Sequence, residues 1–254
     1  MRHEAVWLWL GTGVYFVQIK KGVLVAGIDT PAGYTGLQRI RIGAEADTYR
    51  AWDERAGKQV ALRLFHRFVS GRAEEAAFAA YCATAIGLGR HPAIIEVKAG
   101  GVTATGRPWL AFENLDGRTL EEVLRTDPPG PAEAIELVIT LADALAWAHA
   151  TRPPLTHGRL RAEHVLIGDD GLPRLHDFAP QRTAAPRDDI TNLAALLFRA
   201  LTGHPWPDAD DRIISLWPGL TGLLDETLTP VPAIDSMAIF AGRLRQVVAD
   251  TADF

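Results

Sequence analysis

The sequence has no excess of positive charge, since its 26 lysines and arginines are outnumbered by 31 aspartates and glutamates. Proteins that bind nucleic acids usually carry a basic surface that neutralises phosphates. The chain shows no basic stripe, so no nucleic-acid partner is expected. Its single cysteine, Cys82, excludes an intrachain disulfide and any zinc cluster built on several thiolates. Nothing in the sequence requires an oxidising compartment, and a cytoplasmic location is expected.

The chain also lacks a long hydrophobic run. Its most apolar segment, residues 5–19, is interrupted by Gly11 and Gly13 and ends at two lysines. A membrane-spanning helix needs about 20 predominantly apolar residues, so no membrane span is expected. The β-branched and aromatic residues on both sides of the Gly-Thr-Gly turn are typical of strands. They predict an N-terminal β-hairpin that includes Trp7 and Trp9, and residues 23–25 are a candidate third strand.

What remains is the composition of an ordinary globular protein, with 254 residues, 48% of them hydrophobic and 22% charged. That length is sufficient for one large domain or a compact pair of lobes. Strands are expected at residues 37–42, 46–53, 59–65, 94–99 and 109–113, with a helix at 72–88 among them. Helices are expected at residues 119–125, 131–150, 189–201, 219–228 and 233–250, with short strands at 164–168 and 173–176. The chain therefore divides into a β-hairpin extension with a linker (1–36), a strand-rich lobe (37–115) and a helix-rich lobe (116–254).

Three short motifs occur in a fixed order on these elements. Val60-Ala61-Leu62-Arg63 lies on a strand, and His157-Gly158-Arg159-Leu160 is followed by His164. Asp177-Phe178-Ala179 comes next, before a long helix that begins near Asp189 and ends at Leu201-Thr202-Gly203. In this order the motifs resemble those of a eukaryotic-like Ser/Thr protein kinase domain of the bacterial type. The resemblance covers residues 37–250 and implies a two-lobed α+β kinase-like fold with a β-rich and an α-rich lobe.

The residues at the catalytic positions of that family differ from the family pattern. The lysine that holds phosphates is replaced by Arg63, whose planar fork is not equivalent to an ammonium. Tyr81 stands at the position of the lysine's glutamate partner. Arg159 replaces the aspartate that accepts the hydroxyl proton, and a guanidinium with a pKa above about 12 is no base. His164 replaces the asparagine that holds the second magnesium ion, and only Asp177 is retained among the metal ligands.

The segments around the site are reduced as well. The loop that is rich in glycine in the family retains only Gly43 in residues 43–49. Glu45 and Asp47 are expected to place negative charge where a triphosphate would lie, which disfavours binding. Only residues 178–188 separate Asp177 from the predicted helix at Asp189, which leaves little room for an activation segment or a platform for peptides.

Other positions of the family pattern are retained, and the resemblance assigns them structural roles. His157 and Phe178 match the hydrophobic column between the lobes, and Asp189 matches the helix aspartate that braces the catalytic loop. If a nucleotide binds at all, the resemblance implies contacts with Ala61, Arg63, Phe112, Glu113, Leu115, Leu166 and Asp177. No metal is expected; Asp177 and His164, with His157 as a third member, are the weak candidates for ligands.

These departures predict a catalytically inactive kinase-like domain, a pseudokinase that acts as a scaffold or allosteric regulator. No cofactor is expected, and binding of ATP and magnesium should be weak or absent. The expected partner is another protein, with an active Ser/Thr kinase or its signalling complex as a candidate, and a homodimer through residues 1–35 remains open. The alternative is an atypical nucleotide-binding phosphotransferase or sensor that uses Asp177 and Arg63.

Overall fold

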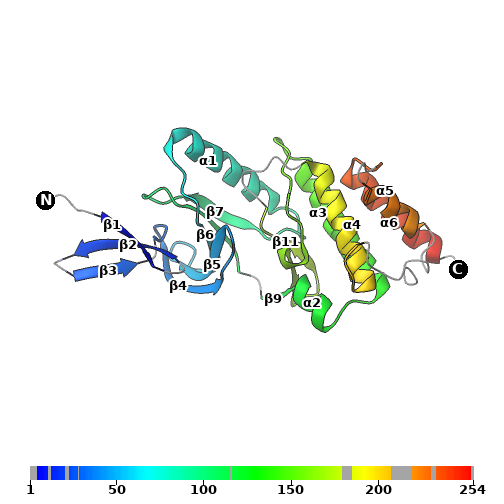
Figure 1. Ribbon diagram of the computed structural model, residues 1–254, viewed down its shortest axis with the longest axis horizontal. Helices are drawn as coiled ribbons and strands as arrows, with labels where there is room; N and C mark the ends of the chain where they lie inside the picture. Colours follow the sequence, from blue (N-terminus) through cyan, green and yellow to red (C-terminus); the bar gives the residue numbers. More distant parts are fainter. Residues whose placement is uncertain are drawn as a thin grey trace. The chain divides into compact units, whose positions relative to one another are not determined.

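The structure is a computed structural model, and it describes residues 5–10, 13–20, 23–27, 29–114, 116–178, 185–206, 219–229 and 233–252. Side chains are described between Asp29 and Asp250. The chain forms two compact units (Figure 1). Unit 1 contains residues 1–86 and 96–114, and unit 2 contains residues 87–95 and 115–254. No helix in the described part is long and apolar enough to cross a membrane.

Unit 1 begins with a three-stranded antiparallel sheet of β1 (Ala5–Leu10), β2 (Gly13–Lys20) and β3 (Val23–Gly27). The predicted hairpin is therefore confirmed and extended by a third strand. In the register of the sheet, Trp7 is paired with Phe16 and Trp9 with Val14. The side chains of these residues lie outside the described part of the structure.

The main sheet of unit 1 has five antiparallel strands in the order β4-β5-β6-β8-β7 (Figure 1). The strands are β4 (Tyr34–Arg41), β5 (Ala46–Asp53), β6 (Lys58–Phe65), β7 (Val97–Val102) and β8 (Pro108–Glu113). The alternating residues Val60, Leu62 and Leu64 of β6 are fully buried in the core of this unit. Helix α1 (Gly71–Leu88) packs beside the sheet through Phe78, whose ring contacts Phe65 at a centroid distance of 5.7 Å.

Two strand boundaries differ from the sequence prediction. β4 begins at Tyr34, inside the predicted linker, because Tyr34 is buried and packs edge-on against Trp109. β7 begins at Val97 instead of Ile94, since Ile94 and Ile95 pair with or hydrogen-bond to Leu175 in unit 2. The sequence pattern gives no sign of this division, in which Ile94 and Ile95 belong to unit 2 and Val97 belongs to unit 1.

Unit 2 is built around α3 (Pro131–His149), which packs against α4 (Pro186–Thr202) and α6 (Met237–Ala252). The core is mainly aliphatic and includes the fully buried Ile135, Leu145 and Leu193, together with the aromatic Phe240. The other helices are α2 (Leu120–Thr126), the 3-10 turn η1 (Ala162–His164) and α5 (Leu220–Thr227). α2 begins with a capping box, in which the Thr119 side chain accepts from Glu122 N and the Glu122 carboxylate accepts from Thr119 N.

A small antiparallel sheet completes unit 2, in the order β11-β10-β9. Its strands are β9 (Gly117–Thr119), β10 (Val165–Gly168) and β11 (Pro173–Leu175). Helix α4 begins at Pro186, three residues before the predicted start at Asp189. The earlier start is explained by proline in the first turn and by Asp188, whose carboxylate accepts from Ala185 N at 2.8 Å. The segment between Asp177 and this helix is therefore even shorter than the sequence analysis indicated.

Candidate functional site

Arg63 lies in the middle of β6, at the position of the phosphate-binding lysine. Its neighbours across the sheet are Thr48 on β5 and Leu110 on β8. The side chain is 7% exposed, and its guanidinium carbon lies 5.3 Å from the centroid of the Phe65 ring. A guanidinium stacks on aromatic rings in this way more readily than an ammonium does. The aromatic neighbour thus favours arginine at this position.

Helix α1 offers no carboxylate at the position of the lysine's usual partner. Tyr81 is buried there, and its ring lies 5.8 Å from that of Phe78. Glu74, two turns earlier, is held at the start of the helix instead. Its carboxylate accepts from Arg67 Nη2 at 2.8 Å and from Ser70 N at 2.8 Å. These contacts satisfy the helix terminus, where carboxylates are favoured.

The hairpin between β4 and β5 is closed on itself. A Cβ atom on Gly43 would lie 2.5 Å from the carbonyl oxygen of Ala46. In a phosphate-binding loop, glycine permits the backbone to approach the ligand. Here the space next to Gly43 is occupied by the backbone of its own turn. The one retained glycine therefore serves the fold of the hairpin.

The expectation that Asp47 presents negative charge to a ligand is wrong. Asp47 is 3% exposed, and its carboxylate lies 3.1 Å from His66 Nε2 and 3.6 Å from Arg39 Nη1. The Tyr49 hydroxyl donates to it at 3.5 Å. Sequence analysis missed this cluster because its members follow no motif and are far apart in the sequence; His66 alone is 19 residues from Asp47. The buried carboxylate consequently holds β4, β5 and the end of β6 together.

The other residues assigned to a nucleotide lie in both units. Ala61 of β6 pairs with Phe112 of β8, and Glu113 pairs with Val60, so the three assigned positions of unit 1 are neighbours in one sheet. Leu115 lies outside the described residues. Leu166 is half-buried on β10 in unit 2, between Arg174 and Thr119 in the sheet.

Asp189 organises the loop that carries the retained histidine motif. Its carboxylate is fully buried and accepts from His157 N at 2.8 Å and from Gly158 N at 2.7 Å. It also lies 2.9 Å from Nε2 of His149, in the last turn of α3. The two backbone bonds are those of the brace that the family resemblance implied. No motif singled out His149, which is 40 residues from Asp189 in the sequence.

His157 is an uncharged structural residue. Its side chain is fully buried, and Nε2 donates to the carbonyl oxygen of His176 at 2.8 Å. Burial lowers the pKa of His157 to about 4, although the Asp189 carboxylate opposes this shift. Its ring stacks on Phe178 at a centroid distance of 4.9 Å. Within unit 2, the pair expected for the hydrophobic column is therefore in contact.

The remaining site residues of unit 2 form a histidine-rich cluster. The ring of His164 lies 5.5 Å from that of His157 and 6.1 Å from that of His176, and its Nδ1 donates to the carbonyl oxygen of Arg159 at 2.7 Å. Burial lowers the pKa of His164, with Asp177 opposing. In the described residues, no group of three or more histidine, cysteine, aspartate or glutamate side chains is placed to hold a metal ion.

Asp177 has a strained backbone. Its φ angle is +67°, a conformation that residues other than glycine rarely adopt. The side chain is 7% exposed, and Oδ1 lies 3.2 Å from His176 Nδ1. Backbone strain of this kind persists only where the surrounding structure over-determines it, and it is concentrated at functional sites.

Comparison with known proteins places these features in context. Residues 36–230 match a family described as a phosphotransferase enzyme family. The chain is 28% identical over 213 residues to the serine/threonine-protein kinase PknL of Mycobacterium tuberculosis, a match that covers 72% of the chain and 52% of PknL. It is 26% identical over 204 residues to PknK of the same species, covering 68% of the chain and 18% of PknK. The chain thus spans about half the length of PknL and less of PknK.

Solved structures give the same fold. The kinase domain of Mycobacterium tuberculosis PknI aligns with a TM-score of 0.71 and 21% sequence identity, covering 86% of this chain and 97% of that domain. The α+β, two-lobed, kinase-like fold expected from the sequence is therefore confirmed.

Proposed function

Since the chain belongs to the phosphotransferase enzyme family, we propose that it is a member without catalytic activity, which acts by binding another protein as a scaffold or allosteric regulator. The proposal rests first on Arg159, at the position where the family places the base that accepts the hydroxyl proton. Arginine remains charged at any physiological pH and accepts no proton. Phosphoryl transfer to a hydroxyl would have to proceed without this group.

The hairpin at Gly43 supports the same proposal. A phosphate-binding loop needs backbone N–H groups that are open to the ligand. The Ala46 carbonyl occupies the space beside Gly43, and the following Asp47 is buried among its own partners. Neither residue is arranged as a cradle for phosphate. We accordingly propose weak or absent binding of ATP and magnesium.

The partner in this proposal is another protein, with an active Ser/Thr kinase or its complex as the candidate class. A homodimer through residues 1–35 stays an alternative. The acidic net charge of −5 argues against a nucleic-acid partner. We propose a cytoplasmic location, because one buried cysteine and no disulfide fit a reducing compartment.

Thermal unfolding with and without nucleotide tests the proposal. A ligand at 100 times its Kd adds about 2.7 kcal/mol to the free energy of unfolding, which raises the Tm of a chain of this size by roughly 5–11 °C. We expect a much smaller shift with millimolar ATP, and the same shift with and without Mg²⁺. A magnesium-dependent rise of 5 °C or more would contradict the proposal.

Asp177 favours a second candidate, an atypical nucleotide-binding phosphotransferase or sensor. A strained and buried aspartate is costly to keep unless it serves a purpose. Such an enzyme would use Asp177 for the metal and Arg63 for the phosphates. Transfer of radiolabelled phosphate by the native chain, abolished by Asp177→Ala, would establish this candidate over the first.

A further inference from the structure

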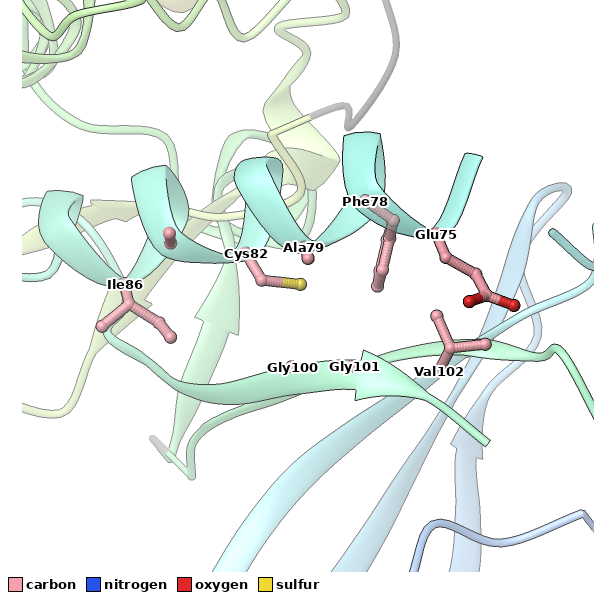
Figure 2. A pocket seen from close by; sticks show the side chains of 9 residues that line it. Glu75, Phe78, Ala79, Cys82, Ile86, Gly100, Gly101 and Val102 are labelled. Atoms are coloured by element: carbon pink, nitrogen blue, oxygen red, sulfur yellow. The ribbon is translucent and has the colours of Figure 1, made fainter. Parts of the chain in front are cut away.

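An apolar groove runs between helix α1 and strand β7 within unit 1. Its volume is about 400 Å³, in the range of about 300–1,000 Å³ that is typical of ligand sites. The walls are Phe78, Ala79, Cys82, Ala83 and Ile86 of α1, together with Glu75 and with Gly100, Gly101 and Val102 of β7. Figure 2 shows Phe78 and Cys82 pointing from α1 toward β7, and Val102 pointing back toward the helix. Ile86 at one end is 43% exposed.

The floor of the groove is backbone. A Cβ atom on Gly100 would lie 2.6 Å from Leu110 Cδ2 and 2.7 Å from Cys82 Sγ. The Cys82 and Leu110 side chains thus occupy the place that a side chain on Gly100 would take. A Cβ atom on Gly101 would lie 3.4 Å from the Trp109 ring, so Gly101 faces the other side of the sheet. On the face toward α1, β7 therefore contributes no side chain to the groove at Gly100.

β7 is the last strand of its sheet, and one of its edges is unpaired within the described residues. Its only partner strand is β8, and none of its residues takes part in the backbone hydrogen bonds outside the sheet. An edge of this kind is a template for pairing with another chain, which proteins usually block with a bulge or a lysine. Here the register shift between Val97 and Ala99, and Lys98 itself, protect only the first half of the strand. The half from Ala99 to Val102, beside the groove, has no such protection.

A negative charge at the mouth of the groove indicates which charge a ligand should carry. Glu75 is exposed, and no hydrogen bond or ion pair involves its carboxylate in the described structure. The neighbouring Glu74 is already engaged by Arg67 and Ser70. A ligand that fills the groove would therefore gain from a cation opposite Glu75.

We propose that this groove binds an extended segment of a partner protein, which adds a strand to the free edge at Ala99–Val102. Side chains two residues apart in the added strand lie on the same face of the sheet. Two apolar side chains, opposite Gly100 and Val102, would fill the groove against Phe78 and Cys82, and a lysine or arginine would meet Glu75. This mode of recognition combines main-chain hydrogen bonds for affinity with pockets for alternate side chains.

The inference deepens the proposed protein-binding function and rests on it. The two can fail separately, because the groove is tested by peptide binding and the lack of catalysis by nucleotide and phosphate-transfer assays.

Selection of a random 12-residue phage-displayed peptide library on the full-length chain tests the inference. We expect enriched sequences in which large apolar residues alternate with other residues and are accompanied by a lysine or arginine. Enrichment of sequences without this alternation would overturn the inference. So would enrichment no higher than on a support that carries no protein.

Two substitutions on exposed positions of α1 provide the matched comparison. Ala79→Trp fills the groove, whereas Ala80→Trp places the same ring on the next residue, which does not line it. The affinity of the selected peptide for Ala79→Trp should be at least tenfold lower than for the native chain. Its affinity for Ala80→Trp should equal that for the native chain. Glu75→Lys should weaken it too, and a peptide with its basic residue changed to glutamate should recover binding to Glu75→Lys. Equal loss in both tryptophan variants would contradict a specific groove.

Amide hydrogen exchange and light scattering identify the binding mode and the occupant. Bound peptide should slow exchange at Ala99–Val102, and unchanged exchange there would exclude strand addition. In light scattering, the native chain without peptide should not self-associate through this groove. A dimer abolished by Ala79→Trp and kept by Ala80→Trp would assign the groove to a second copy of the chain and overturn the proposed partner.

Discussion

At the residue scale, the buried carboxylate of Asp189 holds the loop that carries His157 and Gly158 in a defined shape. It accepts two backbone N–H groups and contacts His149, so its charge is compensated inside unit 2. Removing one partner of a buried charge typically costs about 3–5 kcal/mol, because the remaining group stays buried and unpaired. Asp189 is therefore expected to be essential for the conformation of this loop.

His157 gives a testable pH dependence. Its pKa is about 4 in the folded chain and about 6.5 in the unfolded chain, so between these values only the unfolded state binds the proton. The free energy of unfolding should therefore fall as the pH is lowered from 6.5 toward 4, by up to about 3 kcal/mol, with no such loss above pH 6.5. Urea unfolding at pH 7 and pH 5 measures this difference.

The same substitution, histidine to phenylalanine, at two positions provides a test and its control. His157→Phe keeps an aromatic ring against Phe178 and removes the titrating group, so it should reduce the pH dependence even though the variant is less stable. His204→Phe changes an exposed histidine and should leave the pH dependence as it is. The same pH dependence in native chain and His157→Phe would show that another group is responsible.

At the element scale, single glycines fix the geometry of turns and edges in unit 1. Gly43 permits the tight hairpin between β4 and β5, and Gly100 permits the contact between β7 and α1. Neither role follows from a positive φ angle; each follows from an atom that occupies the place of a Cβ. The sequence resemblance places Gly43 in a loop that binds phosphate in the family, and the structure shows that the Ala46 carbonyl fills the space beside it.

Replacing Gly43 should therefore have the opposite effect from replacing an unhindered glycine. Gly43→Ala forces the new methyl group against the Ala46 carbonyl and should lower the free energy of unfolding by about 1–3 kcal/mol. Gly242→Ala, in the exposed interior of α6, meets nothing within 4 Å and should raise it by about 1 kcal/mol. Chemical denaturation of both variants provides the measurement, and equal stability of the two would contradict the closed hairpin.

The N-terminal sheet should depend on its tryptophans. A sheet of three short strands is stable only if it has an apolar face, and large exposed apolar patches are unusual, so that face is expected to be covered. The double substitution Trp7→Ser and Trp9→Ser should therefore lower the Tm or dissociate an oligomer. If neither Tm nor the mass from light scattering changes, the segment is dispensable.

At the scale of the whole molecule, elements were easier to predict from sequence than contacts. Helix α3 and strand β6 follow from periodicity, and the two-lobed order follows from three motifs and the long helix after them. The burial of Asp47 and the division of the apolar run at Ile95 could not be predicted. Both depend on neighbours that are distant in the sequence, which local patterns do not encode. Motif comparison correctly predicted that Asp189 of α4 braces the histidine loop, because that contact belongs to the family pattern.

Restoring the signature residues should not restore protein phosphorylation. The triple substitution Arg63→Lys, Arg159→Asp and His164→Asn rebuilds a phosphate anchor, a proton acceptor and a metal ligand, and should strengthen binding of Mg-nucleotide. Tyr81 remains, and the segment between Asp177 and Pro186 stays short. Correct positioning of reactants contributes about 7–11 kcal/mol in well-oriented reactions, and much of this is lost if the acceptor is not held.

The assay is transfer of radiolabelled phosphate to a generic basic protein and to the chain itself. We expect transfer from neither the native chain nor the triple variant. Robust labelling of the basic protein by the triple variant would show that the short segment is no obstacle.

The strand order of unit 1 also has a consequence for synthesis on the ribosome. β6 is flanked by β5 and β8, and β8 is completed only at Glu113, after residues 66–112 have been added. At about 5–20 residues per second, β6 waits about 2–10 s for its second neighbour. During that interval its apolar edge can pair with strands of other nascent chains. A translational pause before Glu113 has left the ribosome should therefore favour aggregation, whereas a pause after Asn114 has left it leaves the complete sheet of unit 1 free to form.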